Sequence, residues 1–160
     1  MTRILIADGS DVVRRLLKLL IESRAGWVVC GEAANGTDAV RKSIELKPDA
    51  IVLDLAMEGL NGLLAAREIS NGLPNLPILL HTVNNIPAVV AEAKKFGIRR
   101  VLGKGVDGDR LLNAIQEELD TKPRGVAALL EETAPHIGDA GESEAANGGK
   151  DAKDAPPKVN

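Results

Sequence analysis

Aromatic residues are almost absent from this sequence. Its 160 residues include one tryptophan (Trp27), one phenylalanine (Phe96) and no tyrosine. Any core must therefore be built from aliphatic side chains, and a hydrophobic fraction of 44% is sufficient for an ordinary globular protein. So few aromatic rings disfavour a site in which a flavin or another planar ligand is stacked.

The sequence also has only one cysteine and a small net charge. A single cysteine cannot form an internal disulfide, and Cys30 lies in the apolar run WVVC, which indicates a small core residue and not a nucleophile. The net charge of −3 excludes the basic field of a dedicated nucleic-acid binder. The first residues do not form a signal peptide, and no apolar run approaches the roughly 20 residues of a membrane span. We therefore expect a cytoplasmic protein without membrane association.

Short aliphatic runs alternate with longer amphipathic ones along most of the chain. The segments predicted as strands are 3–7, 27–33, 50–53, 77–81 and 100–103. Nearly continuous apolar strands suit a parallel sheet covered on both faces. Between the strands, apolar residues recur at helical spacing, most clearly at Val13, Leu16, Leu17 and Leu20. Five strand–helix repeats in strict alternation predict right-handed crossovers and a three-layer sandwich.

The alternating pattern stops near Asp120. From residue 134 onward large aliphatic side chains are almost absent, so this segment cannot bury enough surface to offset its loss of chain entropy. We expect one domain over 1–121 and a mostly disordered tail over 122–160, in which a short helix over 125–133 is compatible with the pattern. No second amphipathic helix pair is visible, so the sequence predicts no DNA-binding domain.

Polar side chains mark the ends of four of the five predicted strands. Asp8 follows the first strand, Asp54 the third, Thr82 the fourth and Lys104 the fifth. In an open α/β sheet, functional groups collect at the carboxyl ends of the strands. Each residue alone has a structural explanation, as a helix cap, a strand end or a solvated lysine. The four together predict one site.

These groups suit phosphoryl transfer to a carboxylate. Asp54 would be the nucleophile that attacks a phosphoryl group and forms an acyl phosphate. Asp8, Asp54 and the backbone carbonyl of Ala56 would hold Mg²⁺, which prefers oxygen ligands and keeps several waters. Lys104 and Thr82 would contact the phosphoryl oxygens as a point charge and as a hydrogen-bond donor.

Five segments match the order and spacing of a known family: ILIAD, GEAANGTDAV, KPDAIVLDLAMEGLNGL, LPILLHT and VLGK. They resemble the receiver domain of bacterial two-component response regulators, in the version often joined to helix-turn-helix transcription factors. The resemblance implies a doubly wound, five-stranded parallel sheet of the (βα)5 flavodoxin-like kind. It also implies that Asp54 is the phospho-acceptor, Thr82 the switch hydroxyl and Lys104 the phosphate-contacting lysine. The phosphoryl donor would be a sensor histidine kinase or a phosphotransfer protein.

Three positions depart from that family's pattern. The family has two adjacent acidic residues after the first strand, but here Gly9 follows Asp8, so Mg²⁺ is expected to bind weakly. Asp11, one helical step on, fits better as a helix-start residue. Glu58 stands in the family's proline turn and adds a carboxylate that either compensates or is simply solvated, the second interpretation being favoured. Val101 replaces the aromatic residue to which the switch hydroxyl couples.

Two functions from different classes remain. The first is a single-domain response regulator that accepts a phosphoryl group on Asp54 and signals by contact with an unknown downstream protein. Its enzymatic activity would be at most Mg²⁺-dependent self-phosphorylation and autodephosphorylation. The second is a degenerate receiver that acts as a protein-interaction module without phosphorylation. A flavin-binding or other small-ligand domain is disfavoured because no glycine-rich phosphate loop follows a strand.

Overall fold

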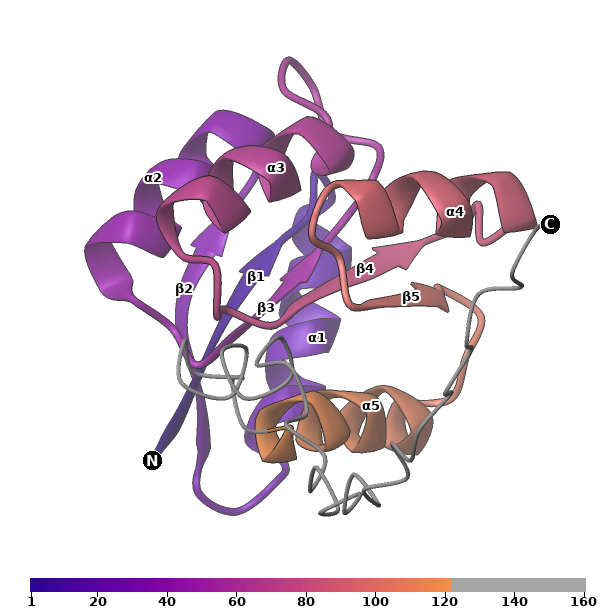
Figure 1. The fold of residues 1–160 in the computed structure, drawn as a ribbon. Helices are drawn as coiled ribbons and strands as arrows, with labels where there is room; N and C mark the ends of the chain where they lie inside the picture. The colour runs from indigo at the N-terminus through magenta and orange to yellow at the C-terminus, as the bar shows by residue number, and fades with distance from the viewer. Residues whose placement is uncertain (122–160) are drawn as a thin grey trace, which may run out of the picture. The chain divides into compact units, whose positions relative to one another are not determined.

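The computed structural model describes residues 1–121, which form five β-strands in strict alternation with five α-helices (Figure 1). The strands are β1 (Thr2–Ala7), β2 (Trp27–Ala33), β3 (Ala50–Leu53), β4 (Ile78–Thr82) and β5 (Arg100–Gly103). The helices are α1 (Asp11–Glu22), α2 (Gly36–Leu46), α3 (Gly62–Gly72), α4 (Pro87–Lys95) and α5 (Gly108–Asp120). All five predicted strands are therefore present, and three have the predicted bounds.

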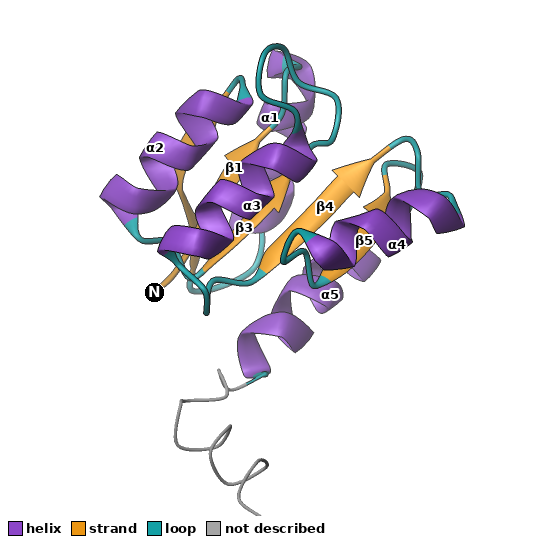
Figure 2. Ribbon diagram, turned by 45° about the horizontal axis from the view of Figure 1, so that its top comes forward, coloured by secondary structure: helices purple, strands orange, loops and turns teal. Residues whose placement is uncertain are grey.

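The strands form one parallel sheet in the order β2-β1-β3-β4-β5. Successive side chains of each strand point to opposite faces, so Ile4 and Ile6 pack with α1 and α5, whereas Leu5 and Ala7 pack with α2, α3 and α4. Figure 2 shows the three helices α2, α3 and α4 in front of the sheet and the other two behind it. The predicted doubly wound sheet and its three layers are thus confirmed.

Four of the five helices begin at a polar side chain that accepts a hydrogen bond from the first turn. The caps are Ser10 for α1, Asn35 for α2, Asn61 for α3 and Asp107 for α5. A side-chain cap satisfies a backbone donor that the helix leaves without a partner. Each of these caps lies in a loop that follows the carboxyl end of a strand, so the caps also fix the loops that surround the candidate site.

Two predicted packing positions are wrong. Leu16 was placed on the buried face of α1 together with Leu17, but Leu16 is 61% exposed, whereas Leu17 is buried as predicted, next to Ile21. Neighbouring helix residues lie about 100° apart, so Leu16 is turned away from the face that Leu17 and Ile21 share. Cys30 is half-buried on the edge strand β2 and not fully in the core. Burial nevertheless raises the pKa of its thiol, which keeps it protonated.

The predicted tail, including the helix expected over 125–133, lies outside the described residues. The domain boundary at residue 121 and the disorder of the tail therefore stay predictions. Among the helices of residues 1–121, none has the length and apolar content that crossing a bilayer requires.

Candidate functional site

Two aspartates lie side by side where the central strands end. Ala7 of β1 is in register with Leu53 of β3, so the residues that follow them, Asp8 and Asp54, leave the sheet together. The backbone N–H of Asp54 donates to the carbonyl of Ala7 at 2.8 Å, which fixes this neighbourhood. Both aspartates are buried, with 2% of Asp8 and 5% of Asp54 exposed. Carboxylates are this deeply buried only where something compensates their charge.

Lys104 supplies that compensation from the end of β5. Its Nζ lies 2.8 Å from Oδ2 of Asp8 and 3.3 Å from Oδ1 of Asp54. The backbone N–H of Lys104 also donates to the carbonyl of Thr82 at 2.8 Å, which holds the start of the β5–α5 loop against the end of β4. One ammonium between two carboxylates leaves the site with a net charge of −1. The three predicted charged residues therefore form one contiguous cluster.

The titration of these groups reflects burial and mutual charge. Burial and the negative charge of Asp8 raise the pKa of Asp54 above its usual value, although Lys104 acts in the opposite direction. Burial acts to lower the pKa of Lys104, but the hydrogen bonds and charges of Asp8 and Asp54 outweigh it and raise that pKa. An ionised Asp54 is thus incompletely compensated, and a further cation beside it would be stabilised.

The ligands available for such a cation are oxygen atoms. Asp8 and Asp54 offer carboxylates, and the carbonyl of Ala56 lies next to position 9, because a Cβ atom placed on Gly9 would be 3.8 Å from it. Within residues 1–121, no three His, Cys, Asp or Glu side chains lie close enough together to bind a metal ion. Two carboxylates and a carbonyl fit Mg²⁺, which keeps several waters when a protein supplies few ligands.

Thr82 lies at the same rim, but its side chain faces the next loop. The residue is 1% exposed, and its Oγ1 accepts a hydrogen bond from the backbone N–H of Asn84 at 3.1 Å. Among residues 1–121, no hydrogen bond joins this hydroxyl to the side chains of Asp8, Asp54 or Lys104. The structure therefore brings Thr82 next to the charged cluster without connecting it to the cluster.

The departures from the family pattern fall in two places. Two of them, Gly9 and Glu58, line one open cleft of about 820 Å³. Ala56 and, from α2, Asp38 and Arg41 line the same cleft. The backbone of Gly9 is not in the left-handed region, and an added Cβ atom would make only ordinary contacts, so the conformation does not require glycine here. Val101 is half-buried on β5, away from that cleft, where it packs against the core.

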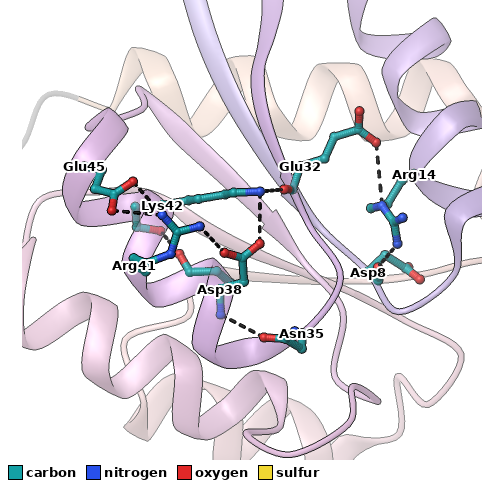
Figure 3. Close-up of polar contacts among 10 residues, drawn as sticks. Asp8, Arg14, Glu32, Asn35, Asp38, Arg41, Lys42 and Glu45 are labelled. Atoms are coloured by element: carbon teal, nitrogen blue, oxygen red, sulfur yellow. Dashed lines mark hydrogen bonds and ion pairs between the residues drawn. The ribbon is translucent and has the colours of Figure 1, made fainter.

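Arg14 is a site residue that the sequence analysis missed. Its Nη1 donates to the backbone carbonyl of Asp8 at 2.8 Å, and its Nε lies 3.6 Å from Oε1 of Glu32 (Figure 3). Arg14 thus ties α1 to the end of β1 and to β2. A signal was available, because Arg14 shares a helical face with the buried Leu17 and Ile21, and an arginine on a buried face needs a polar partner.

His81 is the second residue that was missed. It is 7% exposed, its Nδ1 has no hydrogen-bond partner within the described part of the chain, and it lines a cavity of about 220 Å³ with Lys104 and Leu20. Burial lowers the pKa of His81, and the charge of Lys104 lowers it further, with a smaller opposing effect of Asp8. The signal was a titratable residue at the end of the apolar run PILLH, next to Thr82.

Comparison with known proteins adds independent information. The profile of the response regulator receiver domain matches residues 4–116, which is most of the chain. The chain belongs to this family. The receiver domain is 37% identical over 115 residues to the chemotaxis protein CheY of Thermotoga maritima, and the matched segment covers 72% of this chain and 95% of that protein. It is 33% identical over 115 residues to the transcriptional regulatory protein LnrK of Bacillus subtilis, covering 72% of this chain but 52% of LnrK.

Solved structures give the same family and fold. The response regulator domain of Thermotoga maritima CheB superposes with a TM-score of 0.72 at 30% identity, covering 77% of this chain and 99% of that domain. A LuxR-family response regulator from an Aurantimonas species has a TM-score of 0.72 at 31% identity, covering 82% of this chain and 98% of that one. The receiver domain thus has relatives that consist of little else and relatives about twice its matched length.

Proposed function

We propose that this receiver domain accepts a phosphoryl group on Asp54 in a two-component phosphorelay. The observation that carries the proposal is the position of Lys104, whose Nζ lies 2.8 Å from Asp8 and 3.3 Å from Asp54. A lysine that reaches both carboxylates can also reach an oxygen of a phosphoryl group attached to Asp54. The donor would be a phosphohistidine on a sensor histidine kinase or on a phosphotransfer protein.

In this function each residue has a separate role. A carboxylate oxygen of Asp54 attacks phosphorus, the P–N bond of the phosphohistidine breaks, and its electron pair stays on the imidazole nitrogen. Lys104 moves from the Asp54 carboxylate to a phosphoryl oxygen and neutralises part of its charge. Mg²⁺, when bound by Asp8, Asp54 and the carbonyl of Ala56, supplies the remaining charge neutralisation.

Thr82 would report the modification. The residue is 1% exposed, and its hydroxyl accepts a hydrogen bond from the N–H of Asn84, which leaves the O–H free to donate to a phosphoryl oxygen on Asp54. Turning the side chain toward that oxygen would pull on Asn84 and move the loop between β4 and α4, in which Val83 is 70% and Ile86 is 57% exposed. Output would then occur by contact of a downstream protein with the surface around α4 and β5.

The test is phosphorylation by a small donor. Incubating the whole chain with acetyl phosphate and Mg²⁺ should add one phosphoryl mass, and peptide mapping should place it on Asp54. Asp54→Asn should abolish the label, whereas Asp49→Asn, which removes a carboxylate from an exposed position before β3, should retain it. Persistent labelling of Asp54→Asn at another residue would refute the assignment.

The second candidate function is that of a receiver that binds its partner without phosphorylation. Gly9 favours it, because this position contributes no carboxylate to the metal ligands, and a weak metal site slows transfer. A folded protein that takes up no phosphoryl group from acetyl phosphate or from a phosphorylated histidine kinase would support this candidate.

A further inference from the structure

The site offers two carboxylates and one carbonyl to a metal ion, and Gly9 adds no third carboxylate. Asp8 and Asp54 supply the carboxylates, and Lys104 offsets one of their two negative charges. A third carboxylate would raise the attraction for a divalent ion, and oxygen ligands in octahedral geometry are what this ion requires. The cleft beside Gly9 is the part of the described structure in which such a ligand can approach the Ala56 carbonyl.

Most carboxylates around that cleft already have partners. Asp38 pairs with Arg41 and, at 2.9 Å, with Lys42, and Arg41 also pairs with Glu45 at 2.9 Å (Figure 3). Glu32 faces Arg14 at 3.6 Å on the far side. Each of these carboxylates is already compensated by a cationic partner, so they are poor candidates for a third ligand.

Glu58 differs from these residues. It lines the same cleft as Gly9 and Ala56, it is exposed, and within residues 1–121 it has no ion pair and no side-chain hydrogen bond. It is two residues from Ala56 in the loop that follows β3. The next residue, Gly59, has a positive φ of 71° and lines the same cleft, so the loop turns sharply directly after Glu58.

We propose that Glu58 completes the metal site from outside the direct ligands, by accepting a hydrogen bond from a Mg²⁺-bound water across the cleft left open at Gly9. The inference rests on the proposed function, because it concerns the metal ion of the same acceptor site. It assigns a role to the one carboxylate of the cleft that has no partner within the described residues. With Glu58 included, the site carries three carboxylates and one ammonium, a net charge of −2 in place of −1.

Asp11 is the alternative carboxylate, and the structure disfavours it. It lies in the first turn of α1, where its charge is stabilised by the helix dipole, and its carboxylate is 3.6 Å from Arg15. Its side chain is 70% exposed. Asp11 therefore provides a matched control: it is as close in sequence to Gly9 as Glu58 is to Ala56, and Asp11→Asn removes the same charge as Glu58→Gln.

The experiment is a Mg²⁺ titration of the whole chain by calorimetry, with Mn²⁺ as a paramagnetic probe in NMR spectra. Glu58→Gln should weaken Mg²⁺ binding by roughly tenfold, whereas Asp11→Asn should change it by less than about twofold. Mn²⁺ should broaden the amide signals of Gly9 and Ala56 in the wild type, and more of it should be needed in Glu58→Gln.

A double substitution makes the test specific. Gly9→Asp should tighten Mg²⁺ binding by itself, and in that background Glu58→Gln should have a much smaller effect, because the carboxylate at position 9 would replace the bound water that Glu58 contacts. Equal affinities of wild type and Glu58→Gln, equal losses in Glu58→Gln and Asp11→Asn, or additive effects of the two substitutions would each overturn the inference.

The outcome also separates this inference from the proposed function. Labelling of Asp54 with no dependence of Mg²⁺ affinity on Glu58 would leave the function standing and overturn the role of Glu58. Metal binding that depends on Glu58 without any labelling of Asp54 would support the role of Glu58 and overturn the proposed function. A wild type that binds no Mg²⁺ or Mn²⁺ at this site would overturn the inference as well.

Discussion

Asp54 is a buried carboxylate whose charge is only partly compensated. Burial and the charge of Asp8 raise its pKa above the usual value of 3.8, with Lys104 opposing. The folded protein therefore holds this proton more tightly than the unfolded chain does. The resulting stabilisation is fully present below the unfolded pKa and is lost as pH rises through the folded pKa. At neutral pH the ionised Asp54 thus lowers stability.

Asp54→Asn should accordingly raise the midpoint of thermal unfolding at pH 7, because it removes the charge and keeps the shape. The gain should shrink as pH falls through the raised folded-state pKa of Asp54 toward the unfolded value of 3.8, because the wild-type carboxyl then becomes neutral in both states. Calorimetric unfolding from pH 3.5 to 7 measures both effects. The control Glu68→Gln, at an exposed position of α3, should change stability by no more than about 0.5 kcal/mol. A lower midpoint for Asp54→Asn at pH 7 would mean that the Lys104 pair outweighs burial.

His81 predicts a second pH dependence, of opposite sign. Burial and Lys104 lower the pKa of His81 below its usual value of 6.5, so the unfolded chain takes up this proton first. Stability should therefore decline as pH falls below about 6.5, down to the folded-state pKa. Chemical denaturation between pH 7.5 and 5.5 should show this slope, and His81→Leu should reduce it. The variant His136→Gln, which removes the other histidine, should keep it; loss of the slope in that variant would contradict the prediction.

The charged residues of the site were predictable, whereas their supporting residues were not. Asp8, Asp54 and Lys104 each end a strand that is recognisable from its aliphatic run, and a parallel sheet brings such ends together. Arg14 and His81 had only weak local signals, and their importance became visible in the bond of Arg14 to the Asp8 carbonyl and in the buried, unpartnered Nδ1 of His81 within the described residues. Whether Thr82 and Ala56 have their predicted roles stays a prediction.

Helix α1 shows the limit of periodicity at the level of an element. Its sequence DVVRRLLKLLIE has apolar residues on more than one side, so several stripes with helical spacing are available. The sheet selects the stripe through Leu17 and Ile21, because Ser10 starts the helix at a fixed angle and Arg14 must reach the carbonyl of Asp8. Such contacts between elements decide which leucine is buried, and the sequence alone does not contain them.

The register of α1 can be tested with two adjacent leucines. Leu17→Ala should destabilise the protein by about 2–5 kcal/mol, because Leu17 is 5% exposed and its truncation leaves a cavity. Leu16→Ala, with 61% of the side chain exposed, should change stability by no more than about 0.5 kcal/mol. Denaturant unfolding of both variants measures the difference. Similar losses in the two would show that Leu16 is also buried.

At the level of the whole molecule, composition predicts a folded part and a tail. Residues 1–121 contain every predicted strand and two aliphatic core clusters, one on each face of the sheet, so few aromatics were no obstacle to a packed domain. The fold was predictable because all five strand–helix repeats agree with one topology. The tail gave a prediction from composition alone, and that prediction stands untested.

Truncation after Pro135 tests the prediction about the tail. The deleted residues contain almost no large aliphatic side chains, so removing them should change the free energy of unfolding by no more than about 0.5 kcal/mol. Thermal unfolding of the full chain and of the truncated chain in the same buffer measures this. A midpoint lowered by many degrees would show that the tail packs against the domain.

The ammonium of Lys104 is attached to the chain and already occupies the space between Asp8 and Asp54. A tethered group competes with dissolved ones at an effective concentration in the millimolar range or above. In the proposed function, a divalent ion would therefore compete with Lys104 for Oδ2 of Asp8 and Oδ1 of Asp54 before the carboxylate of Asp54 reacts with a phosphoryl donor. With the metal ion alone or the phosphoryl donor alone, Asp54 would stay unphosphorylated. The lysine would thus make the acceptor site a coincidence detector, which responds only when both arrive together.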